Sequence, residues 1–416
     1  MLASTACCAT CCATKCAFNT LDCITKRSNI LTRIVYILIF LFVTTACWMW
    51  YAWGAEWYAD QFPSSVLHVN CQADVCFGVM SVYRITMILT MFYTLHAIFA
   101  AACGQSKMNS GWGWGLKLLL LAGGIVSTFW IPNEVFLVWA WIAIVGSAVF
   151  LLLQMVLLVD FAHTFAENLL EKYHDNPDDS GPTFALWSIF TTLVSIAVAF
   201  TITEYIMFSS ESGCGNNAIL VSVNVVLILI GAGLAIHPRV QEANPNSGFL
   251  QAATVAAYTA YLVWSAFMSL PNHECNSLHI AKQSFSAVTG AVIVFVSVCY
   301  SAFRASNSIL IRVTSRASSE ETLPIINDDE ATRGGPTPKP FNYVFFHTCF
   351  ALASCYVAML ITRWDLVSDN ESDTDYVIDK SLTSMWVKMA TSWVCHLLYL
   401  WSLVGPILLP DREWYS

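Results

Sequence analysis

Apolar and polar residues follow one another along this chain in long blocks. Ten apolar stretches, each near the length that crosses a bilayer core as a helix, are separated by shorter polar segments. These stretches are residues 31–53, 77–103, 115–131, 134–160, 184–208, 218–236, 249–270, 284–304, 341–361 and 385–409. The pattern predicts an all-α polytopic membrane protein with ten transmembrane helices, of which the third is the shortest.

The longest helical pattern runs from Glu134 to Tyr173. It follows Ile131-Pro132-Asn133, where proline can end one helix and Asn133 can cap the next. Its uncharged part of about 25 residues would measure about 37 Å, whereas a bilayer core is only ~30 Å thick. We therefore expect this fourth helix to be tilted and to run diagonally past the others.

The cytosolic end of this long helix carries a polar stripe. Five residues recur at intervals of three or four and therefore share one helical face: Asp160, His163, Glu167, Glu171 and His174. Three interpretations are open: a solvated cytosolic face, a site for lipid headgroups or protons, and a metal site. The metal site is the weakest, because the sequence identifies no partner helix that would complete the ligands.

Composition and charge support the membrane assignment and exclude some partners. The chain has 416 residues, of which 57% are hydrophobic and 11% charged, and its mean hydropathy is +0.60. Soluble domains usually contain about 25% charged residues. The formal net charge of -9 argues against nucleic acid as a partner.

The distribution of lysine and arginine orients the chain. Most of them fall in inside segments if the N-terminus is inside, so both termini are expected to be cytosolic. Residues 1–30 would then form a cytosolic arm, with a zinc site as an alternative role for its cysteines. Four of these cysteines are candidates for reversible palmitoylation: Cys7, Cys8, Cys11 and Cys12.

The chain divides into four segments on this topology. After the arm, residues 31–304 hold helices one to eight, and residues 341–416 hold the last two helices and a short C-terminus. The cytosolic loop 305–340 is rich in Ser, Pro and acidic residues, which predicts disorder. Within it, Ser315 and Ser319 follow arginines and are candidate phosphorylation sites.

Two signals in the outside loops agree with this orientation. Asn370-Glu371-Ser372 is an acceptor triplet for N-glycosylation. Cys71, Cys76, Cys214 and Cys275 lie where an oxidising compartment permits disulfides. Nearness in sequence favours pairing Cys71 with Cys76, which leaves Cys214 with Cys275, although three connectivities are open.

Several ionisable residues fall within the predicted spans, notably Arg84, Glu204 and Lys388. Each is costly in hydrocarbon and should face protein, water or headgroups. Arg84 and Lys388 start near the outside, so either can extend to the outer headgroups. The histidines within the spans, such as His96, His347 and His396, are more often hydrogen-bonded core residues than ligands.

Common catalytic and nucleotide-binding motifs are missing from the sequence. It contains no GxxxxGK[ST] phosphate loop, so pumping driven by ATP is not supported. It also lacks HExxH and GxSxG. We therefore expect neither an enzyme nor a protein with a cofactor or resident metal, and any transport should run downhill.

A set of motifs in order along the chain resembles the serine incorporator family. The motifs are the Cys-rich N-terminus, Ser127-Thr-Phe-Trp-Ile-Pro-Asn133, Gln154-Met-Val-Leu-Leu-Val-Asp-Phe-Ala-His163, Tyr258-Thr-Ala-Tyr-Leu-Val-Trp-Ser265 with Cys275-Asn276, Phe345-Phe-His347, and the ending from Ser392-Trp-Val-Cys395 to Leu408-Leu-Pro-Asp-Arg412. The resemblance spans nearly the whole chain. It implies a eukaryotic protein with ten transmembrane helices in two bundles, crossed by a long diagonal helix that corresponds to Glu134–Tyr173.

The same resemblance implies a role in lipid handling. Passive scrambling of phospholipids, including phosphatidylserine, between leaflets is our leading hypothesis. The alternatives are a serine carrier or scaffold for enzymes that make phosphatidylserine and sphingolipids, and a non-transporting structural or antiviral membrane protein. Expected partners are membrane phospholipids, serine or lipid-synthesising enzymes, and a second copy of the chain, in the endomembrane system or plasma membrane.

Charge and depth alone nominate residues for a scrambling groove. Asp160, His163 and Glu167 would form its cytosolic mouth, and Arg84 and Lys388 its outer mouth, where cations suit phosphates. Glu204 is a further candidate for the groove.

Overall fold

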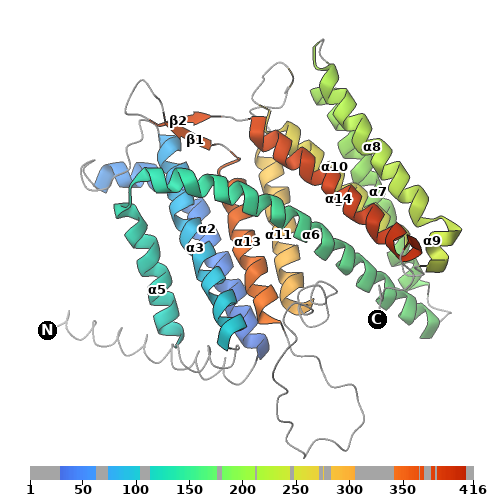
Figure 1. Ribbon diagram of the computed structural model, residues 1–416, viewed down its shortest axis with the longest axis horizontal. Coiled ribbons are helices and arrows are strands. Elements are labelled where there is room, and N and C mark those ends of the chain that lie inside the picture. Colours follow the sequence, from blue (N-terminus) through green and yellow to red (C-terminus); the bar gives the residue numbers. More distant parts are fainter. Residues whose placement is uncertain are drawn as a thin grey trace, which may run out of the picture. The chain divides into compact units, whose positions relative to one another are not determined.

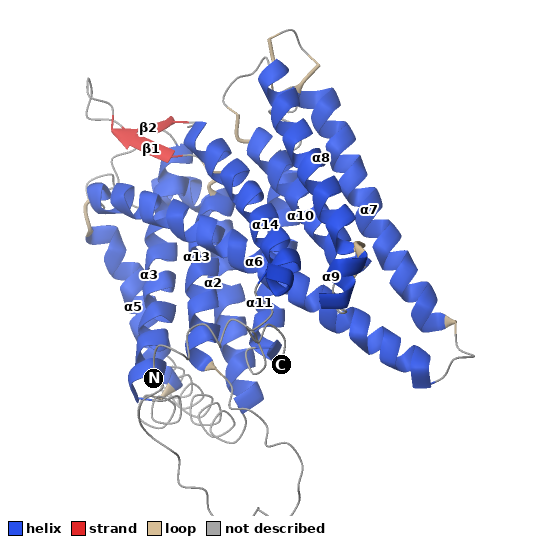
Figure 2. Cartoon of the chain, turned by 45° about the vertical axis from the view of Figure 1, so that its right-hand side comes forward, coloured by secondary structure: helices blue, strands red, loops and turns tan. Residues whose placement is uncertain are grey.

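The computed structural model describes residues 29–61, 74–103, 113–175, 180–210, 213–243, 248–270, 275, 283–304, 342–364, 366–369, 376–379 and 382–408. Its regular elements are helices, apart from one short β-hairpin (Figure 2). The N-terminal arm and the loop 305–340 lie outside these residues.

The elements follow the apolar blocks of the sequence (Figure 1). They are α2 (Asn29–Gln61), α3 (Asp74–Cys103), α5 (Trp114–Ser127), η1 (Thr128–Trp130), α6 (Asn133–Asp175), α7 (Gly181–Phe208), α8 (Gly215–Ala235), α9 (Pro238–Ala243), α10 (Phe249–Phe267), α11 (Gln283–Arg304), α13 (Tyr343–Ile361), β1 (Leu366–Asp369), β2 (Tyr376–Asp379) and α14 (Leu382–Leu408). Each predicted span coincides with a helix.

The polytopic all-α fold class is confirmed. Among the described residues, seven helices are long and apolar enough to cross a membrane: α2, α3, α6, α7, α8, α13 and α14. Trp114–Trp130 and Thr289–Tyr300 are shorter apolar helices. Length and composition therefore support seven spans, and the count of ten stays a prediction.

The chain forms two compact units. The first comprises Met1–Val43, Ile88–Ser127 and Val298–Ala351, and the second comprises Thr44–Met87, Thr128–Ser297 and Leu352–Ser416.

The core of the first unit is aromatic. Tyr93 donates a hydrogen bond to the carbonyl oxygen of Tyr36 at 2.7 Å, which fixes α3 against α2. The ring of His347 on α13 lies edge-on to Tyr36 at 4.7 Å between centroids, and Phe350 packs against Phe40 at 5.3 Å. Large aromatic rings fill this interior, and because they have few side-chain rotamers, ordering them costs little conformational entropy.

The second unit is built around α10 and the long helix α6. α10 packs against α6, α7, α8 and α14, and α6 also packs against α7 and α14. The 43 residues of α6 correspond to about 64 Å, so the predicted long helix is confirmed. The hairpin pairs Leu366 with Asp379 and Asp369 with Tyr376 in antiparallel register.

A close approach explains the glycine within α6. A Cβ atom at Gly146 would lie 2.8 Å from Sγ of Cys355 on α13. No real Cβ makes such a contact, so the helices pack at this distance only because residue 146 lacks a side chain.

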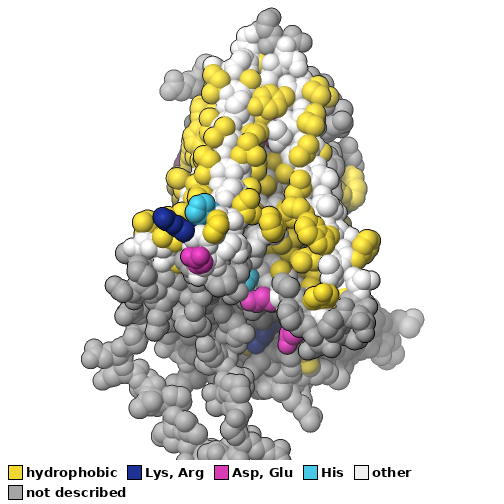
Figure 3. All heavy atoms as spheres, turned by 90° about the vertical axis from the view of Figure 1, so that its right-hand side faces the viewer, with side chains coloured by type: hydrophobic (Ala, Val, Ile, Leu, Met, Phe, Trp, Pro, Cys, Tyr) yellow, Lys and Arg dark blue, Asp and Glu magenta, His cyan; other side chains and the backbone are white. Residues whose placement is uncertain are grey.

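The outer faces of α7 and α8 are apolar. Val226 and Leu229 of α8 and Ile202 and Ile206 of α7 are exposed. Figure 3 shows apolar and uncharged side chains over most of this surface, with charged and histidine side chains gathered toward one end. A surface of this kind matches hydrocarbon rather than water.

Candidate functional site

Polar residues spaced by seven lie on one face of the buried helix α10. Most of α10 is buried, as expected of a helix that neighbours cover on all sides. Gln251, Tyr258 and Ser265 follow one another at intervals of seven, and Ser269 lies one turn further on, so all four share a face. Each contacts a polar partner on α6 or α14. We refer to these four residues with their partners as the α10 seam.

The end of the seam at the start of α10 joins this helix to α6. Nε2 of Gln251 lies 3.0 Å from Nδ1 of His163, and Oε1 of Gln251 accepts a hydrogen bond from the backbone N–H of Gly248 at 2.8 Å. On the other side of the imidazole, Nε2 of His163 lies 3.2 Å from Oε1 of Glu167.

These contacts fix the tautomer of His163. Because Oε1 of Gln251 accepts from Gly248, its Nε2 must donate, and Nδ1 of His163 is the acceptor. Nε2 of His163 then carries the proton and donates to the carboxylate of Glu167. The chain of bonds orients the Glu167 carboxylate at one end of the seam.

The middle of the seam is a second contact between α10 and α6. The hydroxyl of Tyr258 donates to the carbonyl oxygen of Leu151 at 2.8 Å and lies 3.3 Å from Oε1 of Gln154. Gln154 is 1% exposed, and its Nε2 has no hydrogen-bond partner among the described residues. This amide nitrogen is buried and can donate a hydrogen bond to a further partner.

The opposite end of the seam, at the end of α10, joins α10 to α14 through Lys388. Its Nζ donates to the carbonyl oxygen of Ser265 at 3.0 Å and to Oγ of Ser269 at 2.8 Å, and it lies 4.7 Å from the ring centroid of Trp364. From Gln251 to Ser269 the chain advances 18 residues, or about 27 Å if helical throughout. The seam therefore spans nearly the thickness of a bilayer core.

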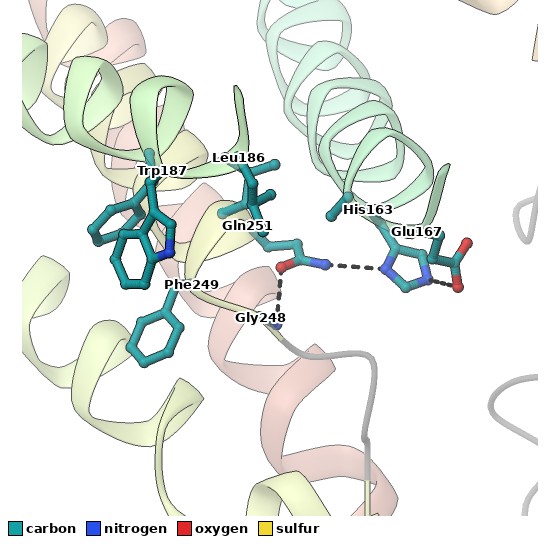
Figure 4. Close-up of a pocket in the computed structure, with 10 residues that line it drawn as sticks. His163, Glu167, Leu186, Trp187, Gly248, Phe249 and Gln251 are labelled. Carbon is teal, nitrogen blue, oxygen red and sulfur yellow. Dashed lines mark hydrogen bonds and ion pairs between the residues drawn. The ribbon is translucent and has the colours of Figure 1, made fainter. Parts of the chain in front are cut away.

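A pocket of about 240 Å³ opens beside the Gln251 end of the seam. Its lining residues come from α6, α7 and the start of α10: His163, Ala166, Glu167, Leu186, Trp187, Phe190, Gly248, Phe249, Leu250 and Gln251. Figure 4 shows the polar chain through Gln251, His163 and Glu167 on one side of the pocket and the rings of Trp187 and Phe249 on the other. The pocket is thus amphipathic.

The structure brings together two members of the predicted cytosolic stripe and separates the rest. His163 and Glu167 line the pocket. Asp160 is half-buried and is not among the residues lining it, and Glu171 is exposed. The side chain of His174 lies outside the described residues.

Arg84 is not a contact for outer headgroups, which corrects the prediction for this residue. It is fully buried, and its guanidinium donates to the carbonyl oxygens of Thr128 and Ile131 and to Oδ1 of Asn133. The ring of Phe136 covers it at 4.1 Å. These contacts satisfy the carbonyls that end η1 and fix the turn into α6, which is a structural role.

Lys388 and Glu204 are also buried rather than open to headgroups in this structure, and a role for them in a groove stays a prediction. Lys388 is 4% exposed, because it binds the C-terminal end of α10 rather than extending outward. Glu204 of α7 is fully buried beside Trp264 of α10. Phe200 and Phe208, one turn to either side, pack against Trp264 of α10 at 5.7 and 5.4 Å.

The structure contains one of the two favoured disulfides. Cys214, before α8, is bonded to Cys275, after α10, with 5.6 Å between the Cα atoms. Cys71 and the side chain of Cys76 lie outside the described residues. So do Asn370 and the candidate modification sites Cys7, Cys8, Cys11, Cys12, Ser315 and Ser319.

Sequence reasoning missed Gln251, Tyr258 and the polar contacts of α8. The spacing of seven within residues 249–270 was the available signal for α10. On α8, Asn224 is fully buried and its Oδ1 accepts from Ser392 at 3.2 Å and lies 2.9 Å from Nε2 of His396. Within the described part of the chain, no three His, Cys, Asp or Glu side chains group as metal ligands.

Comparison with known proteins identifies the family. The family model "Serine incorporator (Serinc)" matches residues 5–412. The chain belongs to the serine incorporator family. A "Probable serine incorporator" from Nematostella vectensis is 33% identical over 94% of this chain and 92% of its own length.

Further relatives of the serine incorporator family span distant eukaryotes. "Serine incorporator 3" from Bos taurus is 29% identical over 94% of each chain. "Membrane protein TMS1" from Saccharomyces cerevisiae is 26% identical over 94% of this chain and 92% of its own. These names describe incorporators or membrane proteins rather than enzymes.

Proposed function

We propose that this serine incorporator family member scrambles phospholipids passively between leaflets, phosphatidylserine included. The observation that carries the proposal is the α10 seam, a line of polar side chains about as long as a bilayer core is thick. The barrier to spontaneous lipid exchange is the transfer of a charged headgroup through hydrocarbon. A line of hydrogen-bonding groups lowers that barrier by replacing water as the headgroup passes.

The proposed route starts at the amphipathic pocket. A headgroup enters beside Gln251 and His163, while its acyl chains stay against the apolar rings of Trp187 and Phe249. It then passes Tyr258 and Gln154, where the amide Nε2 of Gln154 supplies a donor without a partner among the described residues. It leaves beside Lys388, whose ammonium suits a phosphate oxygen.

Separation of α6 and α14 from α10 is part of this proposal. In the closed arrangement the seam residues form hydrogen bonds mainly to one another. A passing headgroup therefore replaces these hydrogen bonds with its own. Each contact between helices in a membrane contributes only about 0.6 kcal/mol on average. Breaking one such contact at a time costs little free energy, so lipid exchange can proceed without an energy source.

Loss of fluorescence in proteoliposomes tests the function directly. Vesicles containing a fluorescent phospholipid are treated with a membrane-impermeant reductant, without ATP or calcium. Empty vesicles should retain about half their fluorescence, because only the outer leaflet is accessible, whereas vesicles with the protein should fall well below half. A plateau at half with folded, reconstituted protein contradicts the proposal.

Serine handling is the second candidate, and the names of the relatives favour it. A carrier would place a compact site for the zwitterion near the membrane midplane. Thermal stabilisation of the purified protein by L-serine, but not by D-serine, would support this candidate. Absence of any serine-dependent shift would leave scrambling as the sole proposal.

A further inference from the structure

The pocket beside α6 has a direction, with an aromatic end and an acidic end. Trp187, Phe190 and Phe249 pack edge to face in a continuous row, with centroids 5.7 and 6.0 Å apart. Glu167 lies at the other end, beyond Gln251 and His163 (Figure 4). A ligand lying along the pocket meets rings first, then amide and imidazole, and a carboxylate last.

The charge of the described lining is negative. Among its residues Glu167 is the one carboxylate and none is Lys or Arg, while His163 contacts Gln251 through Nδ1 and Glu167 through Nε2. The Glu167 side chain is 55% exposed, so its carboxylate is accessible. The bond from His163 to Oε1 holds the carboxylate in place.

This order of groups matches one class of lipid. In a phospholipid the apolar chains are followed by the glycerol, the phosphate and the terminal headgroup. A terminal ammonium would meet the carboxylate of Glu167, while the chains and glycerol lie against the indole and phenyl rings. A headgroup that ends in uncharged glycerol brings only the negative phosphate toward the same carboxylate, which is unfavourable.

We propose that the pocket selects lipids with an ammonium headgroup, such as choline or ethanolamine, and that Glu167 is the residue that determines this preference. The inference rests on the proposed function in that the pocket is the entrance to the α10 seam. It adds the substrate class for that entrance.

Binding of short-chain lipids to the full-length protein in detergent tests this inference without requiring transport. The probes are dihexanoyl phosphatidylcholine and dihexanoyl phosphatidylglycerol, titrated by calorimetry. Because Glu167 is partly exposed, we expect about three- to fivefold tighter binding of the choline lipid, the range of an exposed ion pair. Glu167→Gln should equalise the two affinities, and Glu167→Lys should invert the preference.

Glu171→Gln is the matched control, since Glu171 is an exposed glutamate one turn along α6 and not among the residues lining the pocket. It should retain the preference of the unmodified protein. Equal binding of both lipids by the unmodified protein, or an unchanged preference in Glu167→Lys, would overturn the inference. Selective binding by a protein that does not scramble would refute the proposed function alone, and scrambling without selective binding would refute this inference alone.

Discussion

Polar groups of the neighbouring helices α7 and α10 are satisfied in two ways: within their own helix, as for Thr254 and Thr259 of α10, or by another helix, as for Tyr205 of α7. In α7 the hydroxyls of Thr191, Thr192 and Ser195 donate to carbonyls four residues earlier in the same helix. In α10, Tyr258 and Gln251 bond to a different helix, α6. The hydropathy of the two segments alone does not reveal this difference.

The contrast teaches where function can reside in an apolar bundle. A hydroxyl that bonds to its own backbone is satisfied wherever the helix lies, so α7 can present it on an exposed face. A polar group that bonds to another helix depends on how the helices are arranged, and its bonds change when they separate. The α10 seam can therefore respond to a passing headgroup, whereas the hydroxyls of Thr191, Thr192 and Ser195, which bond within α7, cannot.

Removal of the disulfide is the largest expected perturbation of this pair of helices. Cys214 and Cys275 link the segments that follow α7 and α10 and close a separation of 61 residues. Replacing both by alanine should lower the free energy of unfolding by about 4 kcal/mol, because the unfolded chain regains the entropy of that loop. Titration of dodecylmaltoside micelles with sodium dodecyl sulfate measures the change, and a loss below about 1 kcal/mol would contradict it.

Lys388→Met breaks the end of the seam that joins α10 to α14. The methionine keeps the apolar stem but loses two charge-assisted hydrogen bonds to Ser265 and Ser269. We expect a loss of about 3 kcal/mol in the same unfolding titration. Lys172→Met, at an exposed position of α6, is the control and should change stability by less than about 0.5 kcal/mol.

Glu204→Met should stabilise the protein by about 2 kcal/mol. The carboxyl of Glu204 is fully buried, and an apolar side chain of similar shape removes the free-energy cost of burying a carboxyl group. Thermal unfolding monitored by intrinsic fluorescence gives the sign. A lower unfolding temperature than that of the unmodified protein would mean that Glu204 makes a contact required for folding.

The smallest expected effect on stability gives the most direct comparison of a hydroxyl that bonds between helices with one that bonds within its own helix. Tyr258→Phe removes a hydroxyl that bonds between helices and should cost about 1 kcal/mol. Thr191→Val removes a hydroxyl that bonds within α7 and should cost less than about 0.5 kcal/mol. Equal losses in the free energy of unfolding would contradict the distinction between hydroxyls that bond to another helix and those that bond within their own.

Much of the fold followed from the sequence because the apolar blocks are long. The interval between Pro132 and Pro177 contains one weak breaker, Gly146, and this predicted α6 with an accuracy of a few residues. The stripe containing His163 and Glu167 was visible in the spacing of three and four. Both predictions depend only on residues that are close together in the sequence.

The errors concern which way a side chain faces. Hydropathy gives the depth of Arg84 and Lys388 in the membrane but not the direction of their side chains. Their acceptors lie on other elements, with Ser265 123 residues away from Lys388 and Asn133 49 residues from Arg84. Partners so distant in sequence depend on packing, so the spacing of seven in α10 could reveal the seam but not what it binds.

One comparison of scrambling rates tests the central claim most directly. The double variant Gln154→Leu, Tyr258→Phe replaces the middle of the α10 seam by apolar groups of similar shape, and Thr191→Val, Thr192→Val removes two hydroxyls of α7. Both are reconstituted beside the unmodified protein, and the rate of fluorescence loss is measured in each. We predict that the seam variant is slower by at least about tenfold, equivalent to a barrier raised by about 1.4 kcal/mol, while the α7 variant is unchanged. Equal rates in folded proteins of both kinds would show that the α10 seam is not the route.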